Sequence, residues 1–285
     1  MKTISTFSIV ARDPSTGELG IAVQSKFLAV GAMVPWAKAG IGAVATQAAA
    51  NLHFGELGLE LLARGYSARE TLDALLALDE GREERQLGIV DANGNSAAFT
   101  GSRCHSWAGH INGENFSCQG NILVSSATVE ALADTFQNSE GPLADRLVLC
   151  LDRAQDAGGD RRGRQSAALL VVQEGASYGG YNDVKIDLRV DDHPDPIKEL
   201  RRLLDLHELY FGETLERVAA DAETTMAVQR RLSELGYYSG GITGEYDEAS
   251  RRAYADWCGV ENYEERICEG SFFDRAILDI LLRGK

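Results

Sequence analysis

Two short runs, Thr6-Phe7-Ser8-Ile9-Val10-Ala11-Arg12-Asp13 and Gly20-Ile21-Ala22-Val23-Gln24-Ser25-Lys26, decide the fold of the first part of the chain. Both are rich in β-favouring residues, and the segment between them contains a proline and a glycine, which favour chain reversal. We therefore predict an N-terminal β-hairpin that brings the hydroxyl of Thr6 close to Ser25 and Lys26. A hydroxyl becomes nucleophilic when a base takes its proton, and a lysine in a partly desolvated pocket can assist.

The composition is that of an acidic globular protein. The 285 residues are 44% hydrophobic and 25% charged, which suits one large domain or two ordinary ones. The formal net charge of −15 argues against binding to nucleic acids or anionic membranes. No run approaches the roughly 18 apolar residues of a membrane span, and the N-terminus lacks the apolar core of a signal peptide. We predict a cytoplasmic protein without nucleic-acid or membrane partners.

The cysteines and histidines follow no metal-binding pattern. The five cysteines include no CxxC pair, which favours reduced thiols over a disulfide framework or a zinc site. No ligand spacing joins the residues that could be drawn together as a site, namely His53, His105, His110, Cys104 and Cys118. No phosphate-binding loop follows a strand. We expect no metal and no cofactor.

Strands and pairs of helices alternate along the first two thirds of the chain. The apolar patterns predict strands at 33–39, 40–47, 85–91, 95–100, 166–172 and 186–190, and helices at 54–64, 67–76, 128–135, 143–157 and 197–219. We interpret 103–121 as an irregular loop. This order predicts an α+β fold in which helix pairs cover two antiparallel sheets, a four-layer α/β/β/α sandwich.

A smaller helical domain follows. We predict a linker at 221–223 and helices at 225–235, 247–258 and 272–282. The expected domains are therefore 1–220 and 224–285.

The motifs of the first part resemble a known family. They are Thr6 to Asp13, Ser25-Lys26-Phe27-Leu28-Ala29-Val30-Gly31, Gly42 to Gln47, Trp107-Ala108-Gly109, Gln119-Gly120-Asn121, Asp160 to Ser166 and Val190 to Pro194. Over residues 6–207 they resemble the uncharacterised bacterial family called domain of unknown function 1028, grouped with the N-terminal-nucleophile (Ntn) hydrolases. The resemblance implies an Ntn-hydrolase-like fold, with Thr6 as nucleophile and Lys26 as the basic group.

In an Ntn hydrolase the free amine of the nucleophilic residue serves as base. Thr6 is internal, so its amine is exposed only after cleavage of the Ser5–Thr6 bond. Three alternatives follow: the chain matures by that cleavage, Lys26 acts as base on an internal threonine, or the site is inactive.

Other candidate residues carry a structural alternative beside the functional one. Ser25 accompanies Lys26 in the catalytic group. Gln47 and Thr46 either contact the amide or the oxyanion of the substrate, or form a buried strand end with satisfied hydrogen bonds. The substrate-binding group is Asp160, Arg161, Arg164, Gln165, His193 and Thr46. Its arginines either anchor a substrate carboxylate or form a structural ion-pair loop, and His193 either contacts substrate or fixes a loop.

The C-terminal motifs are Val228 to Leu232, Leu235-Gly236-Tyr237-Tyr238 and Gly241 to Tyr246. They resemble a peptidoglycan-binding-like helical domain, over residues 224–285. We predict hydrolysis of an amide bond in a small or peptide-like substrate. The alternative is a non-catalytic binding protein whose C-terminal module recognises a partner such as cell-wall glycan. Related folds pack by their faces, so we expect a homo-oligomer.

Overall fold

The structure, a computed structural model, describes residues 6–283 of the chain. Contacts between residues divide the chain into two compact units, Met1–Leu204 and Asp205–Lys285. Helix α5 (Pro196–Phe211) crosses the division. The predicted domain boundary at 221–223 falls later in the chain, and the domain ranges stay a prediction.

The first unit contains a six-stranded antiparallel sheet around the predicted hairpin. Strand β1 pairs with β2 from Thr6↔Ser25 to Arg12↔Leu19, which confirms the hairpin. The strand order is β10-β9-β2-β1-β8-β7. The strands are β1 (Thr6–Arg12), β2 (Leu19–Ser25), β7 (Gly109–Gly113), β8 (Phe116–Asn121), β9 (Ser166–Val172) and β10 (Val184–Val190). Thr6 thus begins a strand that has neighbours on both sides.

A four-stranded antiparallel sheet faces it, in the order β3-β4-β5-β6. Its strands are β3 (Pro35–Lys38), β4 (Gly42–Ala48), β5 (Arg85–Asp91) and β6 (Ser96–Thr100). Pro35 lies on the edge strand β3, which suits a residue that has no backbone N–H to donate to a neighbouring strand. The Asn93-Gly94 turn joins β5 to β6 as a hairpin.

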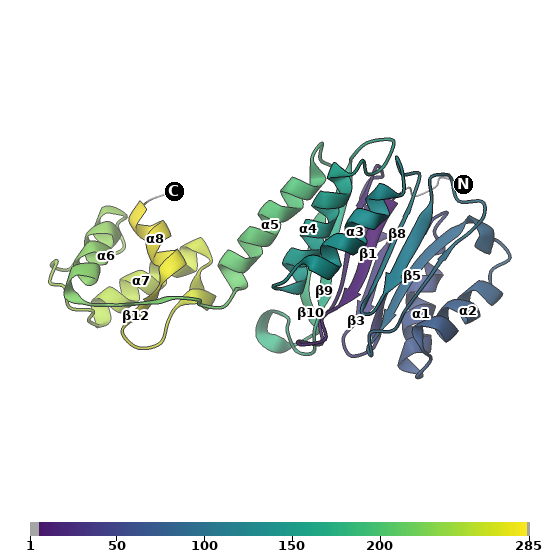
Figure 1. Cartoon of the computed structure of the whole chain (residues 1–285). Coiled ribbons are helices and arrows are strands. Elements are labelled where there is room, and N and C mark those ends of the chain that lie inside the picture. Colours follow the sequence, from purple (N-terminus) through teal and green to yellow (C-terminus); the bar gives the residue numbers. More distant parts are fainter. Residues whose placement is uncertain (1–5, 284–285) are drawn as a thin grey trace. The chain divides into compact units, whose positions relative to one another are not determined.

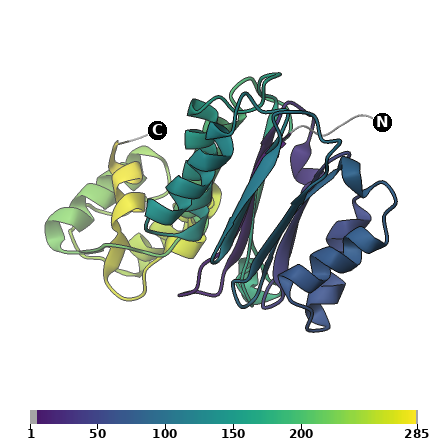
Figure 2. The same ribbon diagram turned by 45° about the vertical axis from the view of Figure 1, so that its right-hand side comes forward.

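Two pairs of amphipathic helices pack on these sheets. Figures 1 and 2 show α3 (Ala127–Asn138) and α4 (Leu143–Asp156) along the six-stranded sheet. Helices α1 (His53–Ala63) and α2 (Ala68–Ala77) lie against the four-stranded sheet on the other side. A capping box begins α2: the Ser67 hydroxyl accepts from the Glu70 N–H, and the Glu70 carboxylate accepts from the Ser67 N–H.

The alternation along β1 explains how the two faces of the central sheet are filled. Phe7 and Ile9 belong to the apolar cluster under α3 and α4. Val10 belongs to a second cluster, which lies between the two sheets and includes Ala45 and Val90 of the other sheet. The even-numbered residues of β1, beginning with Thr6, therefore face the space between the sheets.

Two sequence predictions are corrected. The segment 103–121 was expected to be an irregular loop, but 109–121 form the β7–β8 hairpin. The helix expected over 197–219 ends at Phe211, and Arg217–Ala219 form strand β11 instead. None of the helices between residues 6 and 283 is long and apolar enough to cross a lipid bilayer.

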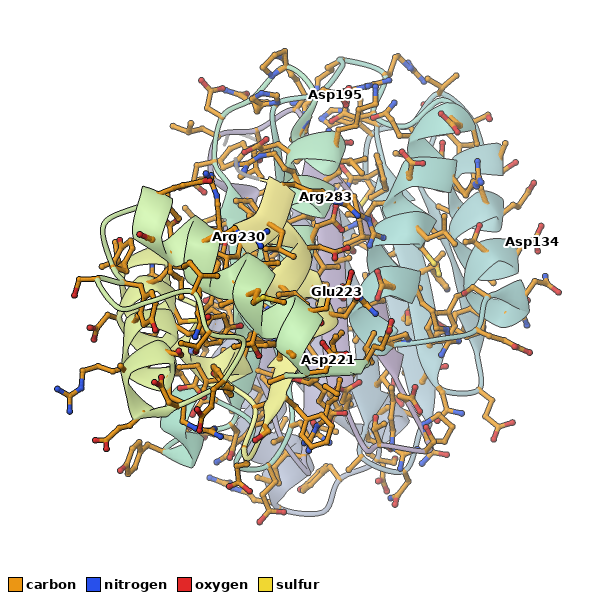
Figure 3. All side chains as sticks on the ribbon, turned by 90° about the vertical axis from the view of Figure 1, so that its left-hand side faces the viewer. Asp134, Asp195, Asp221, Glu223, Arg230 and Arg283 are labelled. Carbon is orange, nitrogen blue, oxygen red and sulfur yellow. The ribbon has the colours of Figure 1, made fainter. Side chains whose placement is uncertain are left out.

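The second unit combines helices with a small sheet. Its elements are α6 (Ala222–Glu234), α7 (Glu248–Glu261), α8 (Arg275–Arg283), and β11 paired with β12 (Phe272–Asp274). Figure 3 shows Asp221 and Glu223 at the start of α6. The Asp221 carboxylate caps that helix by accepting from the Thr224 N–H.

A buried ion pair helps to connect separate segments of this second unit. Arg266 contacts Asp274 at 2.7 Å, and both side chains are buried. The Arg266 guanidinium also donates to the carbonyl oxygens of Glu208 and Leu209. The pair therefore fixes the segment before β12 to the last turn of α5.

Candidate functional site

Four polar residues form a row across one end of the six-stranded sheet. Thr6 pairs with Asn121 of β8 on one side and with Ser25 of β2 on the other, and Ser25 pairs with Ser166 of β9. All four are fully buried. The Thr6 hydroxyl lies 3.3 Å from the Ser25 hydroxyl. The proximity of Thr6 and Ser25 that the hairpin predicts is therefore present.

A hydrogen-bonded network fills the space between the sheets next to this row. Ser8 Oγ donates to Gln47 Oε1 at 2.7 Å, and Gln47 Nε2 donates to Gln86 Oε1 at 2.8 Å. Gln86 Oε1 also accepts from Asn121 Nδ2 at 2.9 Å. Gln119 Nε2 donates to Ser8 Oγ at 2.7 Å. These buried amides link the strand that holds Thr6 to the facing sheet.

The close approach of the sheets at this network depends on one glycine. A Cβ at Gly88 of β5 would lie 2.0 Å from Gln119 Oε1, which is closer than two non-bonded atoms can approach. The absence of a side chain there lets the Gln119 amide reach into the space between the sheets. The oxygen then accepts from Ser117 Oγ at 2.9 Å.

Thr46 lies apart from this group, although it is the neighbour of Gln47. Successive side chains of a strand point to opposite faces, and Val44 packs in the cluster with α1 and α2. Thr46 shares the face of Val44, and its hydroxyl donates to the carbonyl oxygen of Asn51 at 3.2 Å. The structure therefore brings Gln47, but not Thr46, to the polar side of β4.

Lys26 does not point its amine at Thr6. The residue follows the end of β2 and is exposed. Its Nζ donates to the carbonyl oxygen of Arg164 at 3.3 Å, and its backbone N–H donates to Asp160 Oδ2 at 3.0 Å. Lys26 is thus positioned by the loop that precedes β9.

That loop is held by one internal ion pair and by a second ion pair to the turn before α5. The buried Asp160 carboxylate accepts from Arg162 at 3.1 Å, and Arg164 pairs with Asp195 at 3.0 Å. Figure 3 shows Asp195 just before α5. Arg162 and Arg164 therefore have the structural ion pairs that were the alternative to substrate binding.

The remaining candidates of this region also have protein partners. Gln165 Nε2 donates to Asp192 Oδ1 at 3.1 Å, and its backbone N–H donates to the carbonyl oxygen of Ser25. His193 Nδ1 accepts from the backbone N–H of Asp195 at 3.0 Å, which fixes the turn before α5. Arg161 differs, since its guanidinium donates, within the described part of the chain, only to the carbonyl oxygens of Ser106 and Leu123.

Thiol chemistry is disfavoured at the cysteines of this unit. Burial raises the pKa of Cys118 well above its ordinary value, and it raises the pKa of Cys150 to about 12. The pKa of Cys104 is also raised, first by burial. A nucleophilic cysteine needs a lowered pKa, so the hydroxyl row is the better candidate. No group of three or more His, Cys, Asp or Glu residues within 6–283 is arranged to hold a metal ion.

Comparison with known proteins places the first unit in a family. Residues 6–200 match the family model described as a family of unknown function, DUF1028. The chain belongs to the DUF1028 family. Residues 210–281 match a peptidoglycan-binding domain. Both resemblances seen in the sequence motifs are therefore confirmed.

The solved structures include a relative within the family. The crystal structure of a DUF1028 protein from Silicibacter pomeroyi is 32% identical, with a TM-score of 0.66, and the match covers 72% of this chain and 89% of that one. The ancestral β-subunit Anbu from Yersinia bercovieri matches at 14% identity and a TM-score of 0.31, over 70% and 93% of the two chains. The second likeness is too weak to carry an argument. None of the curated proteins compared with the chain matches it significantly.

Several residues of the site escaped the sequence analysis. Asn121, Ser166, Gln86 and Gln119 face the same space as Thr6, but no prediction singled out their side chains. Asn121, Gln119 and Ser166 belong to the family motifs, whereas Gln86 belongs only to the predicted strand at 85–91. The alternation of apolar and polar residues in Phe116-Ser117-Cys118-Gln119 was the available signal for a strand.

Proposed function

We propose that the DUF1028 unit is an Ntn-type amidohydrolase with a four-layer α/β/β/α fold. It would cleave an amide bond of a small or peptide-like substrate, with Thr6 as nucleophile. The observation that carries the proposal is the Thr6 hydroxyl at the start of a central strand, 3.3 Å from the Ser25 hydroxyl in a buried polar row. The two helix pairs outside the facing sheets support the four-layer arrangement.

The base in this mechanism is the amine of Thr6 itself, released by cleavage of the Ser5–Thr6 bond. Lys26 is a weaker candidate because its Nζ is exposed and donates to the Arg164 carbonyl. The amine takes the hydroxyl proton, and Oγ1 attacks the carbonyl carbon of the substrate. The proton then passes to the departing amine, which leaves an ester on Thr6. Water hydrolyses this ester and releases the acid.

Ser25 and the amides beside it would position the nucleophile. Ser25 keeps the Thr6 hydroxyl oriented, and the hydrogen bond from Ser8 Oγ fixes the Gln47 amide on the facing sheet. Gln47 Nε2 already donates to Gln86, so a backbone N–H is the better donor to the oxyanion of the tetrahedral intermediate. Gln47 would therefore be a positioning residue.

The test is the intact mass of purified protein, fresh and after days at neutral pH, followed by assays with simple amides. Wild type should lose residues 1–5 and gain amidase activity, whereas Thr6→Ala should do neither. Thr16→Ala, in the turn between β1 and β2, is the matched control and should behave as wild type. A wild-type mass that never changes, with no hydrolysis, would refute the proposal.

The second candidate is a binding protein that uses its peptidoglycan-binding domain. A surface cavity of about 460 Å³ in this unit is lined by Tyr237, Ser239, Glu248, Arg252 and Asp256, among others. Hydroxyl, carboxylate and guanidinium groups suit the hydroxyl and amide groups of a glycan with peptide stems. Sedimentation with insoluble peptidoglycan tests it: the chain should co-sediment, and Arg252→Ala should reduce the bound fraction. Homo-oligomer formation and a cytoplasmic location stay predictions.

A further inference from the structure

Four cationic residues, Lys26, Arg161, Arg162 and Arg164, gather at the end of the sheet where Thr6 lies. Two of them are neutralised, because Arg162 pairs with Asp160 and Arg164 pairs with Asp195. Among residues 6–283, the side chains of the other two, Lys26 and Arg161, donate only to backbone carbonyl oxygens. Across residues 6–283, no carboxylate comes within 4.0 Å of the amine of Lys26 or the guanidinium of Arg161, and both residues are exposed.

The local acids do not compensate these two charges. The Asp160 carboxylate is turned inward, and it accepts from the Lys26 and Arg162 backbone N–H groups. Asp192 accepts from Gln165. The free charge of Lys26 and Arg161 therefore remains available to a ligand.

Chain connectivity and backbone hydrogen bonds place the segments that carry both cations next to the hydroxyl row. Lys26 directly follows Ser25, the partner of Thr6 in the sheet. The Arg161 backbone N–H donates to the carbonyl oxygen of Ile122 at 3.0 Å, and Ile122 follows Asn121, the other partner of Thr6. The Lys26 N–H in turn bonds to Asp160, the residue before Arg161. The two cations thus lie on segments attached to both sides of Thr6.

We propose that Lys26 and Arg161 bind a carboxylate of the substrate, which makes the substrate class an N-acylated amino acid or short peptide with a free carboxylate near the amide. This inference rests on the proposed amidohydrolase. Guanidinium and ammonium groups bind carboxylates through charge-assisted hydrogen bonds. The chain carries a net charge of −15, which disfavours anions at long range, so any preference for an anion must come from local groups.

The test compares two probes of the same size, N-acetylphenylalanine and its uncharged amide, by calorimetric titration of the full chain. Wild type should bind the acid about tenfold more tightly than the amide, a ratio in the range of one charge-assisted contact. The ratio should fall several-fold in Lys26→Met and in Arg161→Gln, and to about one in the double variant. Arg164→Gln is the matched control, because the charge of Arg164 is already paired with Asp195. This variant should keep the wild-type ratio.

Salt gives an independent readout on unaltered protein. The preference for the acid should shrink at high ionic strength, because exposed charges are screened. Equal binding of the two probes, binding of neither, an unchanged ratio in the double variant, or an equal loss in Arg164→Gln would each overturn the inference.

The outcome is separable from that of the proposed function. A chain that prefers the acid but never loses residues 1–5 and hydrolyses nothing would retain the subsite and refute the hydrolase. A chain that matures and cleaves charged and neutral amides equally well would retain the hydrolase and refute the subsite.

Discussion

Two glutamines of the central core, Gln24 and Gln86, should respond in opposite directions to replacement by leucine. Both side chains are fully buried, and leucine is close to glutamine in size. Gln86 is hydrogen-bonded at both ends, to Gln47 and Asn121 through its oxygen and to the Gly120 carbonyl through its nitrogen. Neither side-chain atom of Gln24 has a hydrogen-bond partner in the described part of the chain.

The magnitudes follow from this difference. Gln86→Leu removes the acceptor of two buried N–H groups and the donor to a buried carbonyl, and each loss costs about 1–3 kcal/mol. The gain from burying leucine offsets part of this, so we expect a net loss of about 3 kcal/mol in the free energy of unfolding. Gln24→Leu removes an amide that is buried without compensation, and should raise that free energy by about 1–2 kcal/mol.

Hydrogen exchange measured by mass spectrometry on peptides covering β1 and β9 reports the stability of this unit separately from the other. Exchange should become more than about 100-fold faster in Gln86→Leu and about tenfold slower in Gln24→Leu. Gln137→Leu, on the exposed face of α3, should stay within about 0.5 kcal/mol of wild type. If Gln24→Leu destabilised the chain as much as Gln86→Leu, the argument from hydrogen-bond satisfaction would be wrong.

Three further predictions concern other contacts. Gly88→Ala would drive a methyl group against the Gln119 amide, so it should destabilise the first unit by about 1–3 kcal/mol. Urea unfolding measures this, and an unchanged unfolding curve would contradict the close approach of the two sheets at Gly88. Asp274→Asn should lower the free energy of unfolding of the second unit by about 3–5 kcal/mol, because Arg266 loses its buried partner. Hydrogen exchange in α7 measures this change, and a loss under about 1 kcal/mol would contradict the prediction. Burial raises the pKa of Asp274, hydrogen bonds from Arg266 lower it, and the net shift is downward. The ion pair therefore stabilises the second unit at neutral pH, and this stabilisation should be lost as the pH falls below the ordinary carboxyl pKa of 3.8. Ser67→Ala should destabilise α2 by about 1 kcal/mol, with Ser67→Gly closer to wild type.

The parts of the fold that local pattern determines were predictable. The hairpin from Thr6 and the strand 166–172 are rich in β-favouring residues, and the α2 cap has its serine and glutamate three residues apart. The β7–β8 hairpin was missed because its inward residues are polar. Gln119 resembles a solvent-facing strand residue in sequence, yet it is buried against Ser8. Periodicity separates polar from apolar faces, but it does not show that a polar face is covered by another sheet.

The end of α5 was missed for a related reason. Leu215 and Val218 continue a helical spacing beyond Phe211, but Val218 pairs with Phe273, which is far away in the sequence. In the candidate site, the hairpin predicted the closeness of Thr6 and Ser25. The partners of Lys26 and Gln47 depend on the loop before β9 and on the facing sheet, which no local pattern specifies.

The residues between the sheets change from polar near Thr6 to apolar further along. The two parts of the interface should therefore respond differently to temperature. Near Thr6 the interface is held by amides such as Gln47 and Gln119, and further along by apolar side chains such as Val10 and Val90. Apolar contacts weaken on cooling. Cold should therefore loosen the apolar part of the interface first and leave the end with the hydroxyl row the better held.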